Sequence, residues 1–262
     1  MVSFNVLGCR GFPLESGGPV SFPEVSPALV QALANRLVHW RADVVILQEA
    51  PLETDVREVA RLAGMQVAFF PAQSNPNAEW PFGFPGAVLS KYPLSEIEDR
   101  ARAIRRPGDE RFQRHWGSVA VTIGAHTLRV QGMHLCADWG GMKRESTRLA
   151  ELEALLSSPA GDLIGADCNT RPGEAPWQRL KEAGWRDGWI EAGAAGDGLT
   201  SDARNRIQRI DYLWLSPQSG WRAAGAEVLT DLKVTVNGTE LFLSDHCPVA
   251  MDLVLDPNTN PR

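Results

Sequence analysis

Short runs of hydrophobic residues alternate with amphipathic segments along this chain. Such runs, bounded by polar and turn-forming residues, are typical of strands buried in a sheet. Their alternation with segments of helical periodicity favours an α/β (α+β) fold over an all-helical or all-β one. We predict strands at Val2–Val6, Val44–Leu47, Ala87–Ser90, Val119–Ile123, Leu128–Met133, Asp162–Ile164, Ile210–Leu215 and Val249–Leu253.

Helices are predicted in several of the gaps between these strands. From Ala28 to Trp40 the apolar residues recur at helical spacing, which indicates a helix that packs one face on a sheet. A second helix, Thr54–Ala63, ends at Gly64, a residue suited to the left-handed conformation of a C-terminal cap. The remaining predicted helices are Arg144–Leu156 and Ala175–Ala183.

The segments between the predicted elements are rich in Gly, Pro, Asn and Asp, as loops are. We expect these long connections to form the walls of a site. They are Gly8–Ser26, Gln73–Pro85, Arg105–Phe112, Asp138–Gly141 and Gly193–Arg206. With 262 residues, 44% of them hydrophobic, and with neither a repeat nor an interdomain linker, the chain is expected to form a single domain over residues 1–262.

Composition and charge narrow the function classes. A formal net charge of -6 argues against a broad electrostatic footprint for nucleic acid, although a local basic cleft or a bound metal can reverse the field. The chain shows neither a signal-peptide pattern at its N-terminus nor an apolar run long enough to span a bilayer. A cytoplasmic protein without a membrane span is therefore expected, and the oligomeric state stays open.

The four cysteines, Cys9, Cys136, Cys168 and Cys247, lie far apart and form no Cys-x-x-Cys pair. This arrangement is wrong for a disulfide scaffold or a zinc ribbon. Their closeness in sequence to candidate site residues raises an alternative, a thiolate–metal site. Carboxylates dominate the candidate set, however, and a free cysteine commonly acts as a small buried hydrophobe.

Polar residues with catalytic potential recur at the boundaries of the apolar runs. They are Asn5, Gln48, Glu49, His134, Asp167, Asn169, Asp211, Asp245 and His246. Each alone has a structural explanation, such as a turn, a helix cap or a core histidine. Strand ends at one edge of a layered α/β fold converge, so together these side chains are expected to share a crevice. Carboxylate and amide oxygens suit Mg²⁺ or Mn²⁺, and His–Asp pairs suit proton transfer.

Five segments, taken in order, resemble the signature of endonuclease/exonuclease/phosphatase (DNase I-like) proteins. They are Leu47–Ala50 (LQEA), Gly83–Leu94 (GFPGAVLSKYPL), Gly165–Asn169 (GADCN), Arg209–Tyr212 (RIDY) and Ser244–Val249 (SDHCPV). The resemblance runs from the first predicted strand to the last. It implies a four-layer α/β/β/α sandwich, with two packed mixed β-sheets between layers of helices, and divalent-metal-dependent hydrolysis of a phosphate ester.

The resemblance also implies a metal site. Glu49 corresponds to the principal ligand, with Asn5 beside it and Asp245 completing or supporting the site. Mg²⁺ retains several waters and contacts substrate phosphate directly, so few protein ligands are needed. The implied cofactor is Mg²⁺ or Mn²⁺.

The same resemblance implies roles for five further residues. Asp167 orients or deprotonates the attacking water, and Asn169 holds the nucleophile or a phosphoryl oxygen in line. Asp211 pairs with His246 and favours the imidazolium, which stabilises the transition state or assists proton transfer. His134 donates a hydrogen bond to a nonbridging phosphoryl oxygen.

Two positions depart from the family pattern. Many nucleases of the family have an acidic residue where this chain has Leu7, which weakens the nuclease interpretation. The usual aromatic of the Gly-Asp-Phe-Asn motif is replaced by Cys168. Neighbouring strand residues face opposite ways, so we expect Cys168 in the core while Asp167 and Asn169 face the site.

Candidate substrate contacts lie in the predicted loops. Arg105 or Arg114 is suited to bind a phosphate through two parallel hydrogen bonds, and Trp139 to stack on a base or cover a sugar or lipid. Ordinary packing is the structural alternative for each. The predicted substrate is a phosphodiester; a DNA or RNA nuclease is the alternative within the family, and a catalytically inactive binding protein is the rival from another class.

Overall fold

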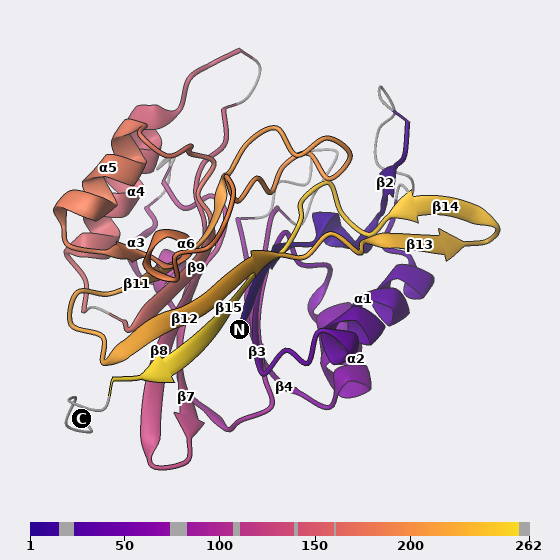
Figure 1. Cartoon of the computed structure of the whole chain (residues 1–262), viewed down its shortest axis with the longest axis horizontal. Coiled ribbons are helices and arrows are strands. Elements are labelled where there is room, and N and C mark those ends of the chain that lie inside the picture. The colour runs from indigo at the N-terminus through magenta and orange to yellow at the C-terminus, as the bar shows by residue number, and fades with distance from the viewer. Residues whose placement is uncertain (16–23, 74–82, 107–110, 139–140, 160, 257–262) are drawn as a thin grey trace.

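The structure is a computed structural model, and it describes residues 1–15, 24–73, 83–106, 111–138, 141–159 and 161–256. Two six-stranded sheets form its centre, with helices on the outer face of each (Figure 1). The first sheet has the order β12 (Trp221–Val228), β15 (Val249–Leu255), β1 (Val2–Asn5), β3 (Val44–Gln48), β5 (Gly86–Ser90) and β4 (Gln66–Phe70). Only β1 and β3 are parallel among these described strands.

The second sheet repeats this plan. Its order is β10 (Arg186–Asp187), β11 (Asp211–Leu215), β9 (Leu163–Asp167), β8 (His126–His134), β7 (Trp116–Ile123) and β6 (Leu94–Asp99). Within this described sheet, β8 and β9 form the one parallel pair, and the other neighbours are antiparallel. Each sheet is therefore mixed.

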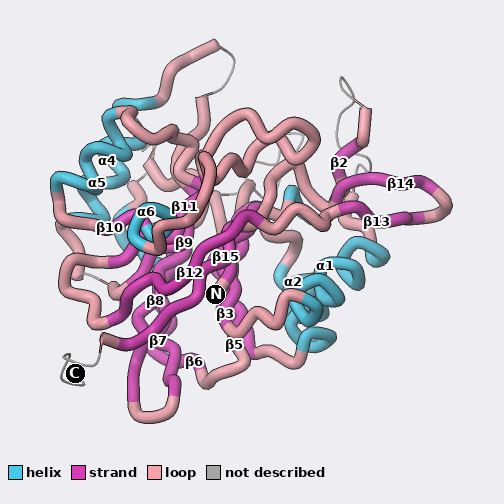
Figure 2. The backbone as a smooth tube through the Cα atoms, viewed as in Figure 1, coloured by secondary structure: helices cyan, strands magenta, loops and turns pink. Residues whose placement is uncertain are grey.

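Helices cover the two outer faces. Those outside the first sheet are α1 (Pro27–His39) and α2 (Glu53–Ala63); the others are α3 (Arg100–Ile104), α4 (Glu145–Leu156), α5 (Ala175–Glu182) and α6 (Gly188–Glu191). A short 3-10 turn, η1 (Leu7–Cys9), follows β1. Figure 2 shows this arrangement, with strands between two groups of helices.

Side-chain alternation along β3 explains how one sheet serves two cores. Val44 and Ile46 belong to the cluster between the sheets, whereas Val45 and Leu47 belong to the cluster under α1 and α2. Successive strand residues face opposite sides, so a strand buried on both faces is apolar throughout. A third cluster, which includes Ile164, packs the second sheet against α4 and α5.

A small third sheet extends from one flank of the molecule (Figure 1). It consists of β13 (Lys233–Val236), β14 (Thr239–Phe242) and β2 (Phe12–Pro13). The hairpin β13–β14 turns through Asn237 and Gly238, both with positive φ, as a tight turn between antiparallel strands requires. This sheet joins the region after β1 to the segment that leads into β15.

The predicted α/β/β/α sandwich is confirmed, and every predicted strand and helix is present within a few residues of its predicted bounds. Several elements were missed, among them β4, β6, β12 and the β13–β14 hairpin. Their residues alternate poorly or are exposed: β6 has no fully buried position, and β12 has one. These strands lie at sheet edges or in the hairpin, where one-sided burial leaves a weaker sequence pattern.

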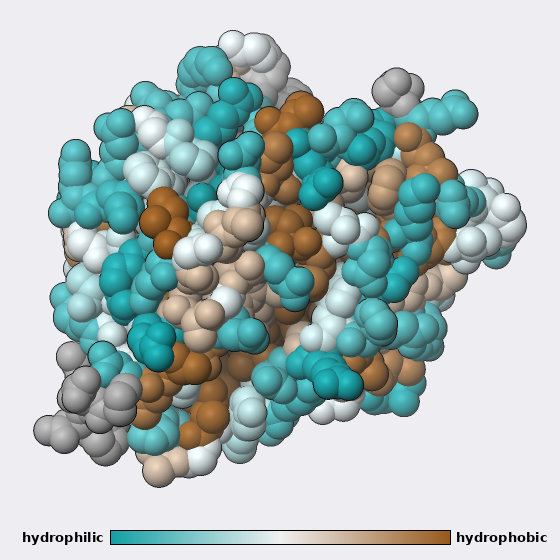
Figure 3. All heavy atoms as spheres, viewed as in Figure 1, coloured by the Kyte–Doolittle hydropathy of each residue, from teal (hydrophilic) through white to brown (hydrophobic). Residues whose placement is uncertain are grey.

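The surface is mainly polar on the view of Figure 3, with hydrophilic residues over the helical flanks and hydrophobic ones gathered along the middle, over β12 and β15. None of the helices that the structure describes combines the length and apolar character needed to cross a bilayer.

Candidate active site

Strands from both sheets bring the candidate residues to one edge of the sandwich. The parallel strands β1, β3, β8 and β9 carry Asn5, Glu49, His134 and Asp167 at or just beyond their C-terminal ends. Because β11 is antiparallel to β9, and β15 to β1, Asp211 and His246 reach the same edge from the beginnings of their strands. The convergence thus involves both the ends and the beginnings of strands.

Asp167 lies at the centre of the cluster. Its Oδ2 accepts a hydrogen bond from Asn5 Nδ2 at 3.0 Å and lies 3.2 Å from His134 Nε2 and 3.9 Å from His246 Nε2. Burial, reinforced by the nearby Asp211 carboxylate, raises the pKa of Asp167 to about 6. A carboxyl group with a pKa near neutrality can accept a proton from water during a reaction.

His246 and Asp211 form a buried pair. His246 Nδ1 is 2.8 Å from Asp211 Oδ2, which leaves Nε2 directed toward Asp167. Burial alone disfavours the imidazolium, but the carboxylates of Asp211, Asp245 and Asp167 outweigh it and raise the pKa of His246 well above its ordinary value. The ring is therefore held in its charged form.

Short hydrogen bonds hold the His246 loop against β1. Ser244 Oγ donates to Asn5 O at 2.6 Å and accepts from His246 N at 3.2 Å. On the other side of the loop, Cys247 N donates to Thr200 O at 2.7 Å. The loop is thus attached to the first strand and to the segment before β11, which positions both nitrogens of the imidazole.

Glu49 follows β3 in a left-handed backbone conformation, with φ of 46°. This turn directs its side chain into the crevice, where 16% of it is exposed. Burial raises the pKa of Glu49 to about 7, and the Asp245 carboxylate adds to the shift, while Arg114, His246 and Asn5 oppose it. Non-glycine residues with positive φ cluster at functional sites, and Asn169, with φ of 46°, is a second case here.

His134 is fully buried and in contact with hydrogen-bond donors. Its Nε2 lies 3.1 Å from Asn169 Nδ2 and makes a close contact with the guanidinium of Arg114. The same Nε2 lies 3.2 Å from the Asp167 carboxylate, so acceptors and donors both surround it. Burial and the positive charge of Arg114 lower the pKa of His134 well below its ordinary value. The ring is neutral, so Arg114 is the stronger hydrogen-bond donor of the two.

The motif around Cys168 behaves as the alternation of side chains predicts. Cys168 is 4% exposed and packs in the core beneath α4 and α5. Asn169 donates its backbone N–H to Asp167 Oδ1 at 3.0 Å and its Nδ2 to Leu135 O at 3.1 Å. These bonds lock the turn after β9, so the orientations of Asp167 and Asn169 depend on each other.

The three candidate substrate contacts have different surroundings. Arg114 is half-buried, and its guanidinium lies 4.6 Å from the ring centre of Phe84. Arg105 donates to the backbone carbonyls of Phe112 and Arg114, so it stabilises the segment that carries Arg114. Trp139 lies outside the described residues.

The donor set fits a divalent cation. Among the described residues, two groups place three ligand atoms within 4.8 Å of one another: Glu49, His134 and Asp167 in one, and Asp167, Asp211 and His246 in the other. Neither group contains a cysteine, which disfavours the thiolate alternative. Carboxylates whose pKa is raised by burial, and further by a neighbouring carboxylate, are groups that a cation such as Mg²⁺ would stabilise in the charged form.

A buried charged pair on α4, Arg148 and Glu151, was not predicted. The Glu151 carboxylate accepts from Phe112 N at 2.7 Å and from Cys136 N at 2.9 Å, and the Arg148 guanidinium donates to Cys136 O at 3.0 Å. Both segments lead directly to site residues, because Arg114 follows Phe112 and His134 precedes Cys136. In the sequence, only the position of these two charged residues on the inner face of the predicted helix could have indicated that they are buried.

His115 is a second residue that the sequence did not reveal. It is fully buried, and neither ring nitrogen has a hydrogen-bond partner within the described part of the chain. Burial lowers its pKa to about 3, so the ring is neutral. It lies 6.4 Å from the His134 ring, and a Cβ on Gly86 would lie 2.1 Å from its Nε2. Gly86 thus makes room for this ring behind His134.

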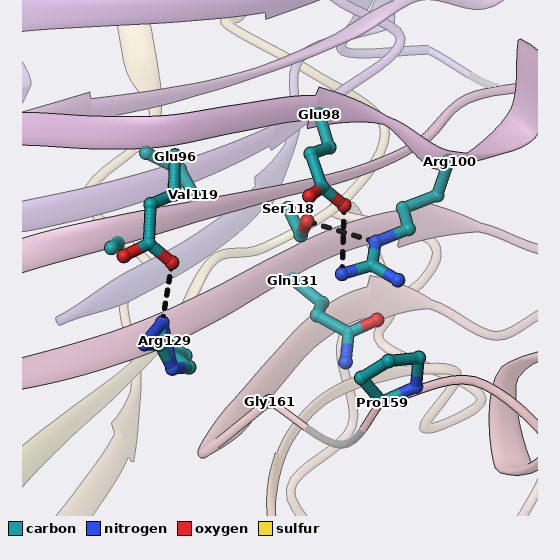
Figure 4. Close-up of a pocket in the computed structure, with 10 residues that line it drawn as sticks. Glu96, Glu98, Arg100, Ser118, Val119, Arg129, Gln131, Pro159 and Gly161 are labelled. Carbon is teal, nitrogen blue, oxygen red and sulfur yellow. Dashed lines mark hydrogen bonds and ion pairs between the residues drawn. The ribbon is translucent and has the colours of Figure 1, made fainter. Parts of the chain in front are cut away.

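One pocket can be set aside as the reaction centre. It has a volume of about 270 Å³ on the outer face of β6, β7 and β8, away from the Asp167 cluster (Figure 4). Its two arginines are each bound to a glutamate, Arg100 to Glu98 at 2.8 Å and Arg129 to Glu96 at 2.7 Å. The charges that line it are therefore paired with each other.

The chain resembles known proteins in sequence and in fold. A model of the Endonuclease/Exonuclease/phosphatase family matches residues 2–246. No curated protein sequence matches the chain significantly. Among solved structures, mannosyl-6-phosphatase from Bacteroides thetaiotaomicron is 15% identical, with a TM-score of 0.71 over 97% of this chain and 98% of that one.

Two further solved structures share the fold. D. rerio TDP2 complexed with a single-strand DNA product is 17% identical, with a TM-score of 0.66 and 97% of each chain covered. A functionally unknown conserved protein from Enterococcus faecalis is 18% identical, with a TM-score of 0.67 over 97% of this chain and 98% of that one. At these identities the likeness establishes the fold alone.

Proposed function

Because the chain belongs to the endonuclease/exonuclease/phosphatase family, we propose that it hydrolyses a phosphate ester, in the first place a phosphodiester, with a divalent cation. The Asp167 cluster carries this proposal: a carboxylate with a pKa near neutrality lies beside a charged histidine and a neutral one. A base, a cationic donor and further hydrogen-bond donors within one crevice are the parts that ester hydrolysis requires.

Glu49, Asn5 and Asp245 are proposed to hold the cation, which is Mg²⁺ or Mn²⁺ by the oxygen-rich character of this set. When bound, the ion neutralises phosphoryl charge and polarises the ester. Glu49 is suited to the role because its carboxylate is largely buried, is close to Asp245 and stays partly exposed to the crevice. Asn5 positions Asp167 through its amide nitrogen while its Oδ1 accepts from Leu7 N at 3.1 Å.

Asp167 is proposed to orient the attacking water and accept its proton. Its Oδ1 is held by the backbone N–H of Asn169, and its Oδ2 by Asn5, so the carboxylate is fixed in one orientation. The raised pKa of Asp167 makes it a better base than an exposed aspartate. Asn169 would hold the nucleophile or a phosphoryl oxygen in line.

His246 is proposed to stabilise the negative charge that develops on phosphorus-bound oxygen. Asp211 holds the proton on Nδ1 and favours the imidazolium, so Nε2–H points into the crevice as a charged donor. This pre-oriented charge acts in a site shielded from water, where its effect is large. The same proton can be delivered to the departing alcohol.

Arg114 and His134 are proposed to bind the nonbridging phosphoryl oxygens from the opposite side. The guanidinium contacts His134 and lies over Phe84, which restricts it to the crevice. Arg114, His246 and a bound divalent cation would together balance the carboxylates of Glu49, Asp167, Asp211 and Asp245.

Nucleic acid is the second candidate substrate. The fold is shared with a TDP2 structure that holds a single-strand DNA product, which makes a single strand the form to test first. The formal net charge of -6 disfavours tight nonspecific binding.

The decisive assay follows hydrolysis of bis(4-nitrophenyl) phosphate and of 4-nitrophenyl phosphate by the purified protein with Mg²⁺ or Mn²⁺. We expect the diester to be cleaved, EDTA to abolish cleavage, and Asp167→Asn to lower kcat by ~10²-fold or more. Hydrolysis of the monoester alone would make the protein a phosphatase. If neither ester nor a single-stranded oligonucleotide is cleaved with either metal, the proposed function is wrong.

A further inference from the structure

A second pocket, of about 610 Å³, is lined by segments that continue into the catalytic cluster, and it suggests which kind of ester the site receives. Three of its lining segments lead directly into proposed catalytic residues. Arg171 follows Asn169 by two positions, Gln208 and Arg209 run into Asp211, and Leu199 precedes Thr200, whose carbonyl accepts from Cys247 N next to His246. The pocket and the reaction centre therefore share their backbone walls.

Two large apolar side chains lie exposed on the rim of this pocket. Ile207 is 70% exposed and Ile190 is 53% exposed, and both are among the large hydrophobic side chains that the described residues leave in solvent. Trp189 forms part of the wall, with its Nε1 donating to Gly196 O at 3.2 Å. Exposed apolar side chains gathered around a concavity, rather than scattered, are typical of ligand sites.

The polar side chains that line the pocket are Arg171, Asp197, Gln208 and Arg209, and three of them are held by hydrogen bonds or an ion pair. Arg209 is 6% exposed, and its guanidinium is bound to the buried Asp187 carboxylate, so its charge is neutralised. Arg171 donates from Nε to Gln208 Oε1 at 3.1 Å, so its guanidinium is held against a second lining residue. Exposed isoleucines and the Arg171 cation in one pocket match an organic group attached to a phosphate.

We propose that this pocket binds one organic substituent of the phosphodiester, a compact ring system of the size of an aryl group or a nucleoside. The inference rests on the proposed function, and it deepens it by assigning the substrate class. A volume of 610 Å³ falls within the roughly 300–1,000 Å³ of pockets that enclose small organic ligands. Arg171 and Gln208 lie close in sequence to Asn169 and Asp211, so a ring bound here would carry its phosphate toward those residues.

The test uses three diesters with the same 4-nitrophenyl leaving group and a methyl, phenyl or thymidin-5′-yl group as the second substituent. Hydrolysis is followed for the wild-type protein and for Ile207→Glu, with Mg²⁺ present throughout. We expect kcat/KM for the better ring-bearing ester to exceed that for the methyl ester by roughly tenfold or more, since a well-filled apolar pocket discriminates by such factors. In Ile207→Glu most of this preference for the ring-bearing ester should be lost.

Ile97→Glu is the matched control, because Ile97 is 53% exposed on β6, outside the pocket. It should keep the wild-type ratio. The choice between phenyl and thymidinyl tells a simple aryl alcohol from a nucleoside. Equal kcat/KM for all three esters in the wild type, or an unchanged ratio in Ile207→Glu, overturns the assignment.

Failure of the proposed function has a different signature, because then none of the three esters is cleaved. Binding is in that case measured by calorimetry with bis(4-nitrophenyl) phosphate. Binding that is lost in Ile207→Glu and kept in Ile97→Glu supports the pocket even without catalysis. Binding that is absent in the wild type, or equal in both variants, overturns it.

Discussion

At the scale of single residues, Asp211 is the clearest case of one side chain acting through another. Its Oδ2 is bonded to His246 Nδ1, and its Oδ1 is buried with no hydrogen-bond partner among the described residues. The register of β11 and β9 places Asp211 directly opposite Asp167. Asp211 therefore sets the tautomer, the charge and the direction of the imidazole without facing the substrate itself.

Asp211→Asn should accordingly lower kcat by ~10²-fold or more while changing KM little, because the amide keeps the shape but no longer favours the imidazolium. Steady-state kinetics on the aryl diester measures both constants. Asp252→Asn, which alters an exposed carboxylate on β15, is the control and should stay within about twofold of wild type. A kcat for Asp211→Asn within threefold of wild type would remove Asp211 from the mechanism.

A site residue could be predicted where the residues next to it in the sequence already mark it as unusual. Asn5, Glu49, His134 and Asp167 stand out because each is a polar residue at the end of an apolar run. The roles of Arg105 and Arg114 could not be separated in this way. Arg105 binds the carbonyls of Phe112 and Arg114 because of how the loop folds back, and a sequence does not show that path.

At the scale of elements, α4 supports the site through the Glu151 carboxylate. The folded-state pKa of Glu151 is raised to about 7, chiefly by burial, whereas an unfolded glutamate has a pKa of about 4.3. The folded protein consequently binds the additional proton. Above the unfolded pKa, stability is lost as the pH rises, and the loss is complete once the pH exceeds the folded pKa.

We therefore expect the free energy of unfolding to fall by roughly 2 to 4 kcal/mol from this group as pH rises from about 4.5 to about 7.5. Urea unfolding across that range, in the presence of EDTA, compares the wild type with Glu151→Gln. In Glu151→Gln, the free energy of unfolding should not show this part of the decrease with pH. Glu153→Gln, an exposed change on the same helix, should keep it. Parallel slopes for wild type and Glu151→Gln would show that Glu151 does not carry the proton.

The elements that the sequence predicted well are those buried on one or both faces. Val44–Gln48 is fully buried, and a nearly continuous apolar run marks it. Leu163–Asp167 is also fully buried, but the predicted strand, Asp162–Ile164, covered only its first two residues, because Gly165 and Asp167 interrupt the apolar run. Leu94–Asp99 has no fully buried residue, so its place at the sheet edge comes from pairing with β7 rather than from its own pattern. Whether such a segment becomes a strand depends on hydrogen bonds to a neighbouring strand, and the periodicity of its own sequence does not show these bonds.

At the scale of the whole molecule, the spacing of the two sheets fixes the site. A Cβ added to Gly165 would lie 2.2 Å from Ile46 Cδ1 on the facing sheet. The buried Gln48 side chain also crosses this interface, donating to Gly165 O at 3.5 Å. Close approach of β3 and β9 brings Glu49 and Asp167 into one crevice, because each follows or ends one of these strands.

Gly165→Ala should destabilise the protein by ~1–3 kcal/mol through overpacking between the sheets. Ile46→Val removes the clashing Cδ1, so the double variant should recover part of that loss despite the smaller core residue. Thermal or urea unfolding gives the free energies. Gly225→Ala is the control, since its Cβ would meet its nearest neighbour at 3.4 Å, an ordinary contact. A Gly165→Ala protein as stable as wild type would show that the sheets can separate without cost.

The pairing of the first strand with the last determines when, during synthesis and folding of the chain, the protein can become active. Val2 lies opposite Ala250, and Ser244 Oγ, just before β15, bonds to Asn5 O just at the end of β1. A growing chain that has reached only β11 already contains Glu49, His134 and Asp167, yet it has neither His246 nor the strand that completes the β1 edge. Hydrolysis would therefore begin only when β15 pairs with β1, and not in proportion to the structure already formed.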